Sequence, residues 1–370
     1  MANNNDKKVL NVPALRFPEF TGEWEKCKLS KVCSFFSGGT PPSSNKEYYN
    51  GNIPFIRSGE LHNDETELFI TKEGLDNSAA KMVEVGDLLL ALYGATSGDI
   101  AISKIKGAIN QAILCIRTKQ NKKFVESVWN KHVARLLQTY LQGGQGNLSA
   151  DIVKNIPFYF TNIEEQNKLA RFISLLDQRI AAQNKIIEKL QSLIKGIAQN
   201  VARNNKPYIR LSECLECRSS TLQESDVCKN NTYPVYGANG IVGYLDNYNT
   251  EDEAVYIIKD GSGVGTVSYV TGKCSATGTL NILQAKDGYS LRYLYYLLKV
   301  FNFEPYKTGM AIPHIYFKDY GRAKIFCPSY TEQLQYARLL SAIDDKVSAE
   351  QNVLTSLSLQ KQYLLRQIFI

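Results

Sequence analysis

The sequence lacks any uninterrupted apolar stretch of the ~20 residues that a membrane-spanning helix needs, so we predict no transmembrane segment. Its first residues, Met1 to Lys8, are polar and carry no apolar core of the kind found in secretory signals. We therefore expect a cytoplasmic protein whose residues 1–11 form a disordered tail.

The motifs of several enzyme classes are also missing. The sequence has no Gly-x4-Gly-Lys-Ser/Thr loop for nucleotide phosphates and no Asn/Asp-Pro-Pro-Tyr/Phe run, which is typical of amino-methyltransferases. The glycines of residues 261–265 are followed by a strand-like Thr266–Val270 segment, whereas a phosphate cradle needs a helix there. Neither a metal-nuclease constellation nor a Ser-His-Asp set is evident, and we interpret Asp99 and Asp260 beside the glycines as turn residues. We predict a non-catalytic chain that holds no cofactor itself.

Histidine is scarce, with three scattered residues, and this weakens the case for a metal site. Among the eight cysteines, Cys214 and Cys217 have the spacing of two zinc ligands, and Cys228 is a candidate third. No second close pair of cysteines or histidines accompanies them, so reduced core or surface thiols are the better interpretation. We predict no metal site.

The charge balance favours a polyanionic partner without proving one. The chain has 43 Lys and Arg against 36 Asp and Glu, a formal net charge of +7. Many basic proteins bind no nucleic acid, so composition alone leaves this open.

The strongest feature that is present is a long internal repeat. Glu165-Gln166 opens one helix-like run and Glu332-Gln333 opens another, at an offset of 167 residues (332 minus 165). The same offset pairs identical residues along both runs: Ala170 with Ala337, Arg171 with Arg338, Ser174 with Ser341, Asp177 with Asp344, Ala182 with Ala349 and Leu190 with Leu357. A period this long exceeds the ~20–50 residues of solenoid repeats. It indicates a duplicated assembly of one globular module and one long helix.

Both runs show apolar steps that alternate between three and four residues, the a/d pattern of a coiled coil. The predicted seam consists of Ile173, Leu176, Ile180, Ile187, Leu190 and Ile194 in the first helix and Leu340, Ile343, Val347, Leu354, Leu357 and Leu364 in the second. Gln183 interrupts the first seam, and Glu350 stands at the matching place in the second. We expect the two helices to pair antiparallel, because each leaves one module and must reach the other.

The chain therefore divides into module 1 (residues 12–160), a central helix (161–205), module 2 (206–330) and a C-terminal helix (331–370). Strand-like runs at Ile53–Gly59, Leu88–Gly94 and Ala108–Ile116 make module 1 strand-rich, with a helix over residues 122–142. Module 2 repeats the pattern in shorter form. The predicted fold class is α+β: two mixed, strand-rich modules separated by two long helices that pair as an antiparallel coiled coil.

Both modules carry polar and basic side chains in loops, the groups that contact phosphates and base edges. In module 1 the candidates for DNA binding are Ser37, Thr40, Arg57, Ser58, Tyr93, Thr96, Ser97, Asn110, Gln111, Gln145 and Asn147. In module 2 they are Ser219, Ser220, Tyr236, Asn239, Lys259, Ser262, Thr277, Thr279, Lys307 and His314. Each residue alone is more simply a solvated loop or turn residue, but their paired placement in both halves favours a shared function.

The sequence resembles the specificity subunit of type I restriction-modification systems. The resemblance rests on the Pro13–Trp24 opening, on Ser37–Pro41 and Ile53–Glu60, on the module ends Gly146–Ser149 and Ile312–Ile315, and on the two Glu-Gln helix openings. It covers the chain from about residue 12 to its end. Module 2 departs from the pattern because it is shorter and lacks the Phe-Pro-x-Phe…Trp opening.

The resemblance implies two target-recognition domains, each of which reads one half of a split double-stranded DNA site. It also implies that the helices set the spacer and dock two methyltransferase subunits, which two restriction/translocase subunits then join. S-adenosylmethionine, ATP and Mg²⁺ would belong to those partner subunits. Two alternatives stay open: a partner that fuses methyltransferase and nuclease in one polypeptide, and a stand-alone regulator with two DNA-binding lobes.

Overall fold

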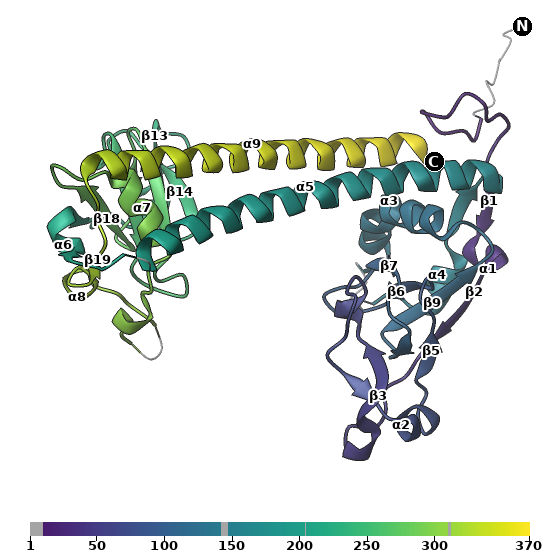
Figure 1. Cartoon of the computed structure of the whole chain (residues 1–370). Helices are drawn as coiled ribbons and strands as arrows, with labels where there is room; N and C mark the ends of the chain where they lie inside the picture. The colour runs from purple at the N-terminus through teal and green to yellow at the C-terminus, as the bar shows by residue number, and fades with distance from the viewer. Residues whose placement is uncertain (1–9, 142–146, 204, 310–311) are drawn as a thin grey trace, which may run out of the picture. The chain divides into compact units, whose positions relative to one another are not determined.

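The computed structural model in Figure 1 describes residues 10–141, 147–203, 205–309 and 312–370. The chain divides into two compact units, one of residues 1–182 with 354–370 and one of residues 183–353. Each unit contains one module and parts of both long helices. All but the last two residues of the predicted tail 1–11 lie outside the described residues.

Module 1 contains two four-stranded sheets and one two-stranded sheet. Their strand orders are β2-β9-β6-β7, β4-β3-β8-β5 and β1-β10. The strands are β1 (Glu25–Lys28), β2 (Cys33–Ser37), β3 (Tyr49–Ile56), β4 (Phe69–Ile70), β5 (Lys81–Val83), β6 (Leu88–Ala91), β7 (Ile100–Ile102), β8 (Gly107–Ile109), β9 (Ile113–Thr118) and β10 (Pro157–Phe160). The helices are α1 (Leu29–Val32), η1 (Lys46–Tyr48), η2 (Ser58–Glu60), α2 (Lys72–Asp76), α3 (Lys122–Leu141) and α4 (Ala150–Asn155).

Module 2 repeats this plan with strand orders β12-β18-β15-β16, β14-β13-β17 and β11-β19. The strands are β11 (Ile209–Arg210), β12 (Leu215–Ser219), β13 (Tyr233–Gly237), β14 (Gly240–Leu245), β15 (Glu253–Ile258), β16 (Val267–Thr271), β17 (Ser275–Ala276), β18 (Leu280–Ala285) and β19 (Lys324–Ile325). The helices are α6 (Leu211–Cys214), η3 (Glu224–Asp226), α7 (Leu291–Lys299), η4 (Glu304–Tyr306) and α8 (Phe317–Tyr320). The predicted strand-rich architecture is confirmed.

The offset of 167 residues also holds in the strand registers. In module 1, Leu88 pairs with Ile102 on β7 and with Ile116 on β9. In module 2, Val255 pairs with Tyr269 on β16 and with Leu283 on β18, which are the same three positions plus 167. The duplication therefore preserves the hydrogen-bond register of the central sheet as well as the helices.

The central strands are apolar throughout because both of their faces are buried. Leu88 and Leu90 of β6 pack in one core cluster, whereas Leu89 and Ala91 pack in another. Strand β15 divides in the same way between two clusters. A strand covered on both sides needs no polar alternation, which explains the continuous apolar runs in the sequence.

One predicted strand is wrong in its extent. The run Ala108–Ile116 forms two strands, β8 and β9, which belong to different sheets. Between them the Oδ1 of Asn110 accepts a hydrogen bond from the backbone N–H of Ala112 at 3.0 Å. This local side-chain bond is typical of an Asx turn, and it ends one strand before the next begins.

The two long helices are α5 (Ile163–Arg203) and α9 (Tyr330–Ile368). In the first unit the start of α5 lies with the end of α9, where Asp177 and Lys361 form an ion pair at 2.5 Å. In the second unit the end of α5 packs with the start of α9, with Ile194 and Leu340 in one core cluster. The pairing within each unit is therefore antiparallel, as predicted (Figure 1).

The predicted seam side chains are all at least half-buried. Those that are buried are Ile173, Ile187, Ile194, Leu340 and Leu357, and those that are half-buried are Leu176, Ile180, Leu190, Ile343, Val347, Leu354 and Leu364. Gln183 is 8% exposed, and its Nε2 donates to the backbone carbonyl of Glu350 at 3.0 Å and also to the Glu350 carboxylate. The two polar interruptions of the seam thus meet each other.

Within the part of the chain that the structure describes, no helix has the length and hydropathy needed to span a bilayer.

Candidate nucleic-acid interface

Each module has one tight hairpin at the end of its central strand. In module 1 the hairpin between β6 and β7 turns at Gly94 and Gly98, both with a φ of 86°. In module 2 the hairpin between β15 and β16 turns at Gly261 and Gly265, with φ of 96° and 91°. Side chains with a Cβ rarely adopt such values, so glycine is required for these turns. The glycines of residues 261–265 therefore belong to a hairpin.

Two further loops are tied to each hairpin by equivalent backbone hydrogen bonds. Leu92 N donates to Ala112 O at 2.8 Å, and Leu148 N donates to Leu92 O at 2.8 Å. In module 2, Lys259 N donates to Thr279 O at 3.0 Å, and Ile315 N donates to Lys259 O at 2.9 Å. We call the resulting groups loop cluster 1 (residues 92–98, 110–112 and 147–149) and loop cluster 2 (residues 259–265, 277–279, 308 and 313–315).

Loop cluster 1 contains most of the candidates predicted for module 1. Gln111 is central, because its Oε1 accepts from Thr40 Oγ1 at 2.6 Å and its side chain lies near enough to the Tyr93 hydroxyl to offset in part the rise in pKa that burial causes there. Burial raises the pKa of Tyr93 above its ordinary value, so the hydroxyl stays neutral and can donate or accept. Asn147 and Gln111 are exposed. The side chains of Asn110 and Ser97 bond to backbone within the cluster, at Ala112 N and Leu92 O respectively.

Thr96 also belongs to loop cluster 1, whereas Ser37 does not. Thr96 accepts the Asp99 N–H through its backbone carbonyl, and Ser37 ends β2 opposite Leu114. Gln145 lies outside the described residues.

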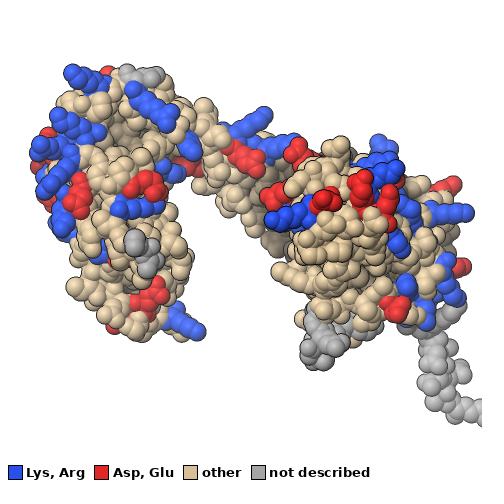
Figure 2. All heavy atoms as spheres, turned by 90° about the horizontal axis from the view of Figure 1, so that it is seen from below, with Lys and Arg blue, Asp and Glu red and all other residues tan. Residues whose placement is uncertain are grey.

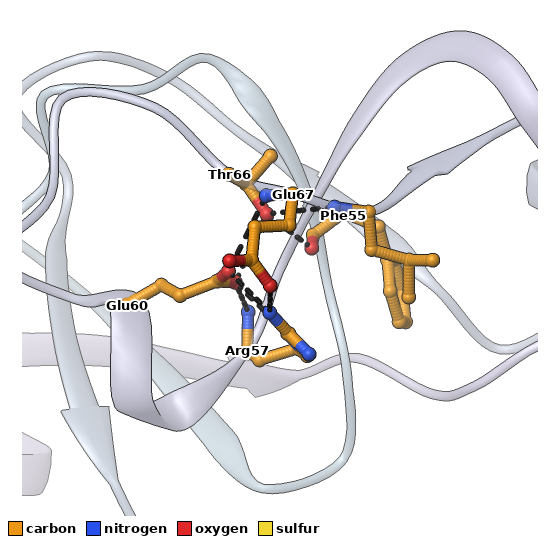
Figure 3. Close-up of polar contacts among 6 residues, drawn as sticks. Phe55, Arg57, Glu60, Thr66 and Glu67 are labelled. Carbon is orange, nitrogen blue, oxygen red and sulfur yellow. Dashed lines mark hydrogen bonds and ion pairs between the residues drawn. The ribbon is translucent and has the colours of Figure 1, made fainter. Parts of the chain in front are cut away.

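Arg57 lies outside the cluster in a separate polar network (Figure 3). Ser58 follows Arg57 as the first residue of η2. Arg57 Nη2 bonds Glu60 Oε1 at 2.6 Å and Glu67 Oε2 at 2.9 Å, and Thr66 Oγ1 donates to Glu60 at 2.9 Å. Burial opposes the charge on Glu60, but the hydrogen bonds from Arg57 and Thr66 outweigh it and lower its pKa to about 2. These contacts give Arg57 a structural role in holding η2. Its contact with DNA stays a prediction.

Loop cluster 2 gathers Lys259, Ser262, Thr277, Thr279 and His314. Thr277 is 1% exposed and its Oγ1 lies 2.8 Å from Thr279 Oγ1. Its side chain is therefore a buried contact within residues 277–279. His314 Nδ1 lies 2.7 Å from Asp260 Oδ1. The sequence interpretation of Asp260 as a simple turn residue missed this pair, since only the fold brings residues 54 positions apart together.

The other candidates of module 2 are not part of loop cluster 2. Ser219 ends β12 opposite Asn281, Ser220 Oγ accepts from Leu222 N, and Lys307 pairs with Glu304 at 2.5 Å. Tyr236 and Asn239 lie in and after β13, where the Tyr236 carbonyl accepts from Thr277 N at 2.9 Å.

The Glu-Gln openings of both long helices act as internal clamps. Gln166 is fully buried: its Oε1 accepts from Asn121 N at 3.1 Å, directly before α3, and its Nε2 donates to Thr161 O at 2.7 Å. Gln333 is 2% exposed and repeats this, because its Oε1 accepts from Ser290 N directly before α7 and its Nε2 donates to Pro328 O, both at 2.9 Å. Each clamp joins the start of a long helix to the helix of its own module.

The surface charge and the possible metal ligands give no further site among the described residues. Figure 2 shows Lys and Arg side chains on both globular parts, with Asp and Glu among them. Among the described residues no group of three or more His, Cys, Asp or Glu side chains is placed to hold a metal ion. Cys214 is buried in α6, Cys217 is half-buried in β12 and Cys228 is exposed.

Residues 21–192 and 207–359 match the family described as "Type I restriction modification DNA specificity domain", so the family pattern occurs once in each half. The chain belongs to this family. The predicted resemblance is confirmed, and the duplicated module and helix are the two copies of the specificity domain.

Individual relatives agree with this assignment. The chain is 22% identical to the type I restriction enzyme EcoprrI specificity subunit of Escherichia coli, over 87% of this chain and 88% of that protein. It is 24% identical to the MjaVIII specificity subunit of Methanocaldococcus jannaschii, over 50% of this chain and 43% of that protein.

Solved structures share the fold. The crystal structure of the type I restriction-modification S subunit from M. genitalium has a TM-score of 0.64 at 18% identity and covers 97% of this chain and 99% of that one. A chain from a study of complex assembly and conformational transition of the type I system has a TM-score of 0.56 at 17% identity, over 92% and 96% of the two chains.

Proposed function

We propose that this specificity chain reads a bipartite DNA target, with loop clusters 1 and 2 each reading one half. The observation that supports the proposal most strongly is the contrast between backbone and side chains. The two clusters share their backbone hydrogen bonds at the offset of 167 residues, whereas the side chains at matching positions differ: Tyr93 and Asn147 in cluster 1, Asp260 and His314 in cluster 2. A constant scaffold with different polar groups suits two different half-sites.

In this proposal the long helices set the spacer between the half-sites. Helix α5 has 41 residues and α9 has 39, which correspond to lengths of roughly 60 Å at 1.5 Å per residue. One turn of DNA is ~34 Å long, so helices of this length suit half-sites separated by one to two turns.

The helices would also dock two methyltransferase subunits, and two restriction/translocase subunits would complete the complex. The chain itself would be non-catalytic and located in the cytoplasm. S-adenosylmethionine would be bound by the methyltransferase subunits, and ATP with Mg²⁺ by the translocase subunits. None of these three cofactors is assigned to this chain.

The decisive experiment maps DNA methylation. The chain is co-expressed with its methyltransferase subunit in a host without DNA methylation, and modified adenines are located by sequencing. We expect a motif with two short specific halves and a fixed gap. A continuous motif, or methylation that persists without this chain, would rule out bipartite reading.

A matched variant tests the helical spacer. Four residues inserted within residues 178–190 lengthen α5 by about one turn, or ~6 Å. We expect both half-sites to be kept and the gap to change. An unchanged gap would show that the helices do not set the spacing.

Exchange of residues 12–150 for those of another family member should alter one half-site only.

A further inference from the structure

The pair formed by Asp260 and His314 is held more firmly than its surface position requires. Gly261 N donates to Pro313 O at 3.0 Å, and Ile315 N donates to Lys259 O at 2.9 Å. These two backbone bonds flank the side-chain pair, in which Nδ1 and Oδ1 are 2.7 Å apart. The backbone alone therefore joins the hairpin to the loop, and the side-chain pair is not needed for that purpose.

The exposure of the pair also argues against a mainly structural role. The side chains of His314 and Asp260 are 34% and 36% exposed. Ion pairs and hydrogen bonds at this exposure contribute little to stability, because water competes for both partners. The pair is nevertheless positioned by several constraints, since His314 N donates to Thr308 O at 2.7 Å and Thr308 N donates to His314 O at 2.8 Å.

The hydrogen-bond chemistry defines what the outer edge of the imidazole offers. An ionised carboxylate only accepts hydrogen bonds, so the Nδ1 of His314 carries the proton that it donates to Asp260. In the neutral ring Nε2 is then an acceptor. In the major groove of DNA the donors that an acceptor can read are the N6 amino group of adenine and the N4 amino group of cytosine. The carboxylate beside the ring disfavours a phosphate contact, because both groups are negative.

We propose that His314, with its ring neutral, reads the exocyclic amino group of one adenine or cytosine in the half-site bound by module 2, and that Asp260 is the positioning residue that fixes the imidazole tautomer. This inference rests on the proposed function. It assigns the reading to one atom, Nε2, and to a single base position.

The test compares four variants in the methylation assay, with a DNA library that carries every base at each half-site position. In Asp260→Ala and His314→Ala, discrimination at one position of one half-site should fall about tenfold, with the other half-site unchanged. Asp260→Asn can accept from Nδ1 through its amide oxygen or donate to Nδ1 through its NH2 group, so it no longer fixes the tautomer and should also weaken discrimination at that position. Asp287→Ala, an exposed aspartate beyond the far end of β18, is the matched control and should change nothing.

A fifth variant controls for the possibility that an alanine variant fails to fold. His314→Asn introduces the residue that the scaffold already carries at the equivalent position, Asn147, and should fold while its base preference changes. Unchanged discrimination in His314→Ala and His314→Asn would overturn the inference. A uniform loss over all sequences would overturn it as well, because it would indicate a phosphate contact. In both cases a split wild-type motif would leave the proposed function standing, whereas a wild-type motif without two halves would refute the proposed function.

Discussion

Replacement of Gln166 by leucine should destabilise module 1 by an amount that follows from its contacts. The side chain is fully buried, and it satisfies the Asn121 N–H and the Thr161 carbonyl. Leucine has a similar volume but cannot bond either group. Leaving a buried backbone group without a partner costs about 1–3 kcal/mol. Both groups here are only partly buried, so we take about 1–2 kcal/mol for each, or about 2–4 kcal/mol together. Burial of the added apolar surface offsets part of this, and we expect a net loss of about 2–3 kcal/mol.

The chain offers a clean reporter for this prediction. Trp24 and Trp129 are the two tryptophans of the sequence, and both are buried in the core cluster of the first unit. Urea unfolding followed by tryptophan fluorescence therefore reports on module 1. With a slope of about 2–3 kcal/mol per M, the midpoint should fall by about 1 M. Gln178→Leu, an exposed glutamine on the same helix, is the control. A Gln166→Leu midpoint equal to that of the control would refute the clamp.

Three further changes follow from individual contacts. Glu60→Gln should destabilise module 1 by about 3 kcal/mol at neutral pH, since a pKa lowered from 4.5 to about 2 stabilises the fold above pH ~4.5. This difference should shrink in unfolding experiments as the pH falls towards 2. Asp177→Asn removes the ion pairs of Asp177 with Lys123 and Lys361. Burial opposes the charge on Asp177, but the two lysines outweigh it and lower the pKa of Asp177. The variant should therefore be less stable than the wild type at neutral pH, and this difference should disappear in acid. Leu190→Pro should cost ~3 kcal/mol or more and abolish co-purification with the methyltransferase subunit, whereas intact co-purification would contradict docking on the helices.

The sequence predicted the architecture well where a pattern repeats. The offset found from Glu165 and Glu332 holds in the strand registers and in the hairpin hydrogen bonds. The period of the apolar residues located both helices, because burial of one stripe is a local property of the chain. The division of Ala108–Ile116 was missed, since the apolar run continues across a turn that depends on the Asn110 side chain.

The candidate site was less predictable, because its contacts join residues far apart in the chain. Asp260 and His314 are 54 residues apart and meet only through the hairpin and loop of module 2. Arg57 illustrates the opposite problem. It is basic and placed in a loop, but its guanidinium bonds two carboxylates of its own module, which the sequence alone did not indicate. The Glu-Gln openings were recognised as a signature, but their role as clamps required the backbone partners to be known.

The polar pair of Gln183 and Glu350 raises the question of what fixes the helix register. The two residues are one repeat apart, so their contact marks the point where equivalent positions of the two helices meet. A polar pair in an apolar seam often specifies register at some cost in stability. Here module 2 also fixes it, because Ile194, Ala198, Ala337 and Leu340 pack with its strands in one core cluster.

The core contacts of module 2 are more numerous than the single Gln183–Glu350 contact, so they should determine the helix register. A slip by one heptad would remove all of these core contacts, whereas a double change of Gln183→Leu and Glu350→Leu removes one polar contact and makes the seam continuously apolar. We therefore expect the double variant to be at least as stable as the wild type and to methylate DNA with the same single gap. A mixture of gaps would show that the polar pair, and not the core of module 2, determines the register of the helices.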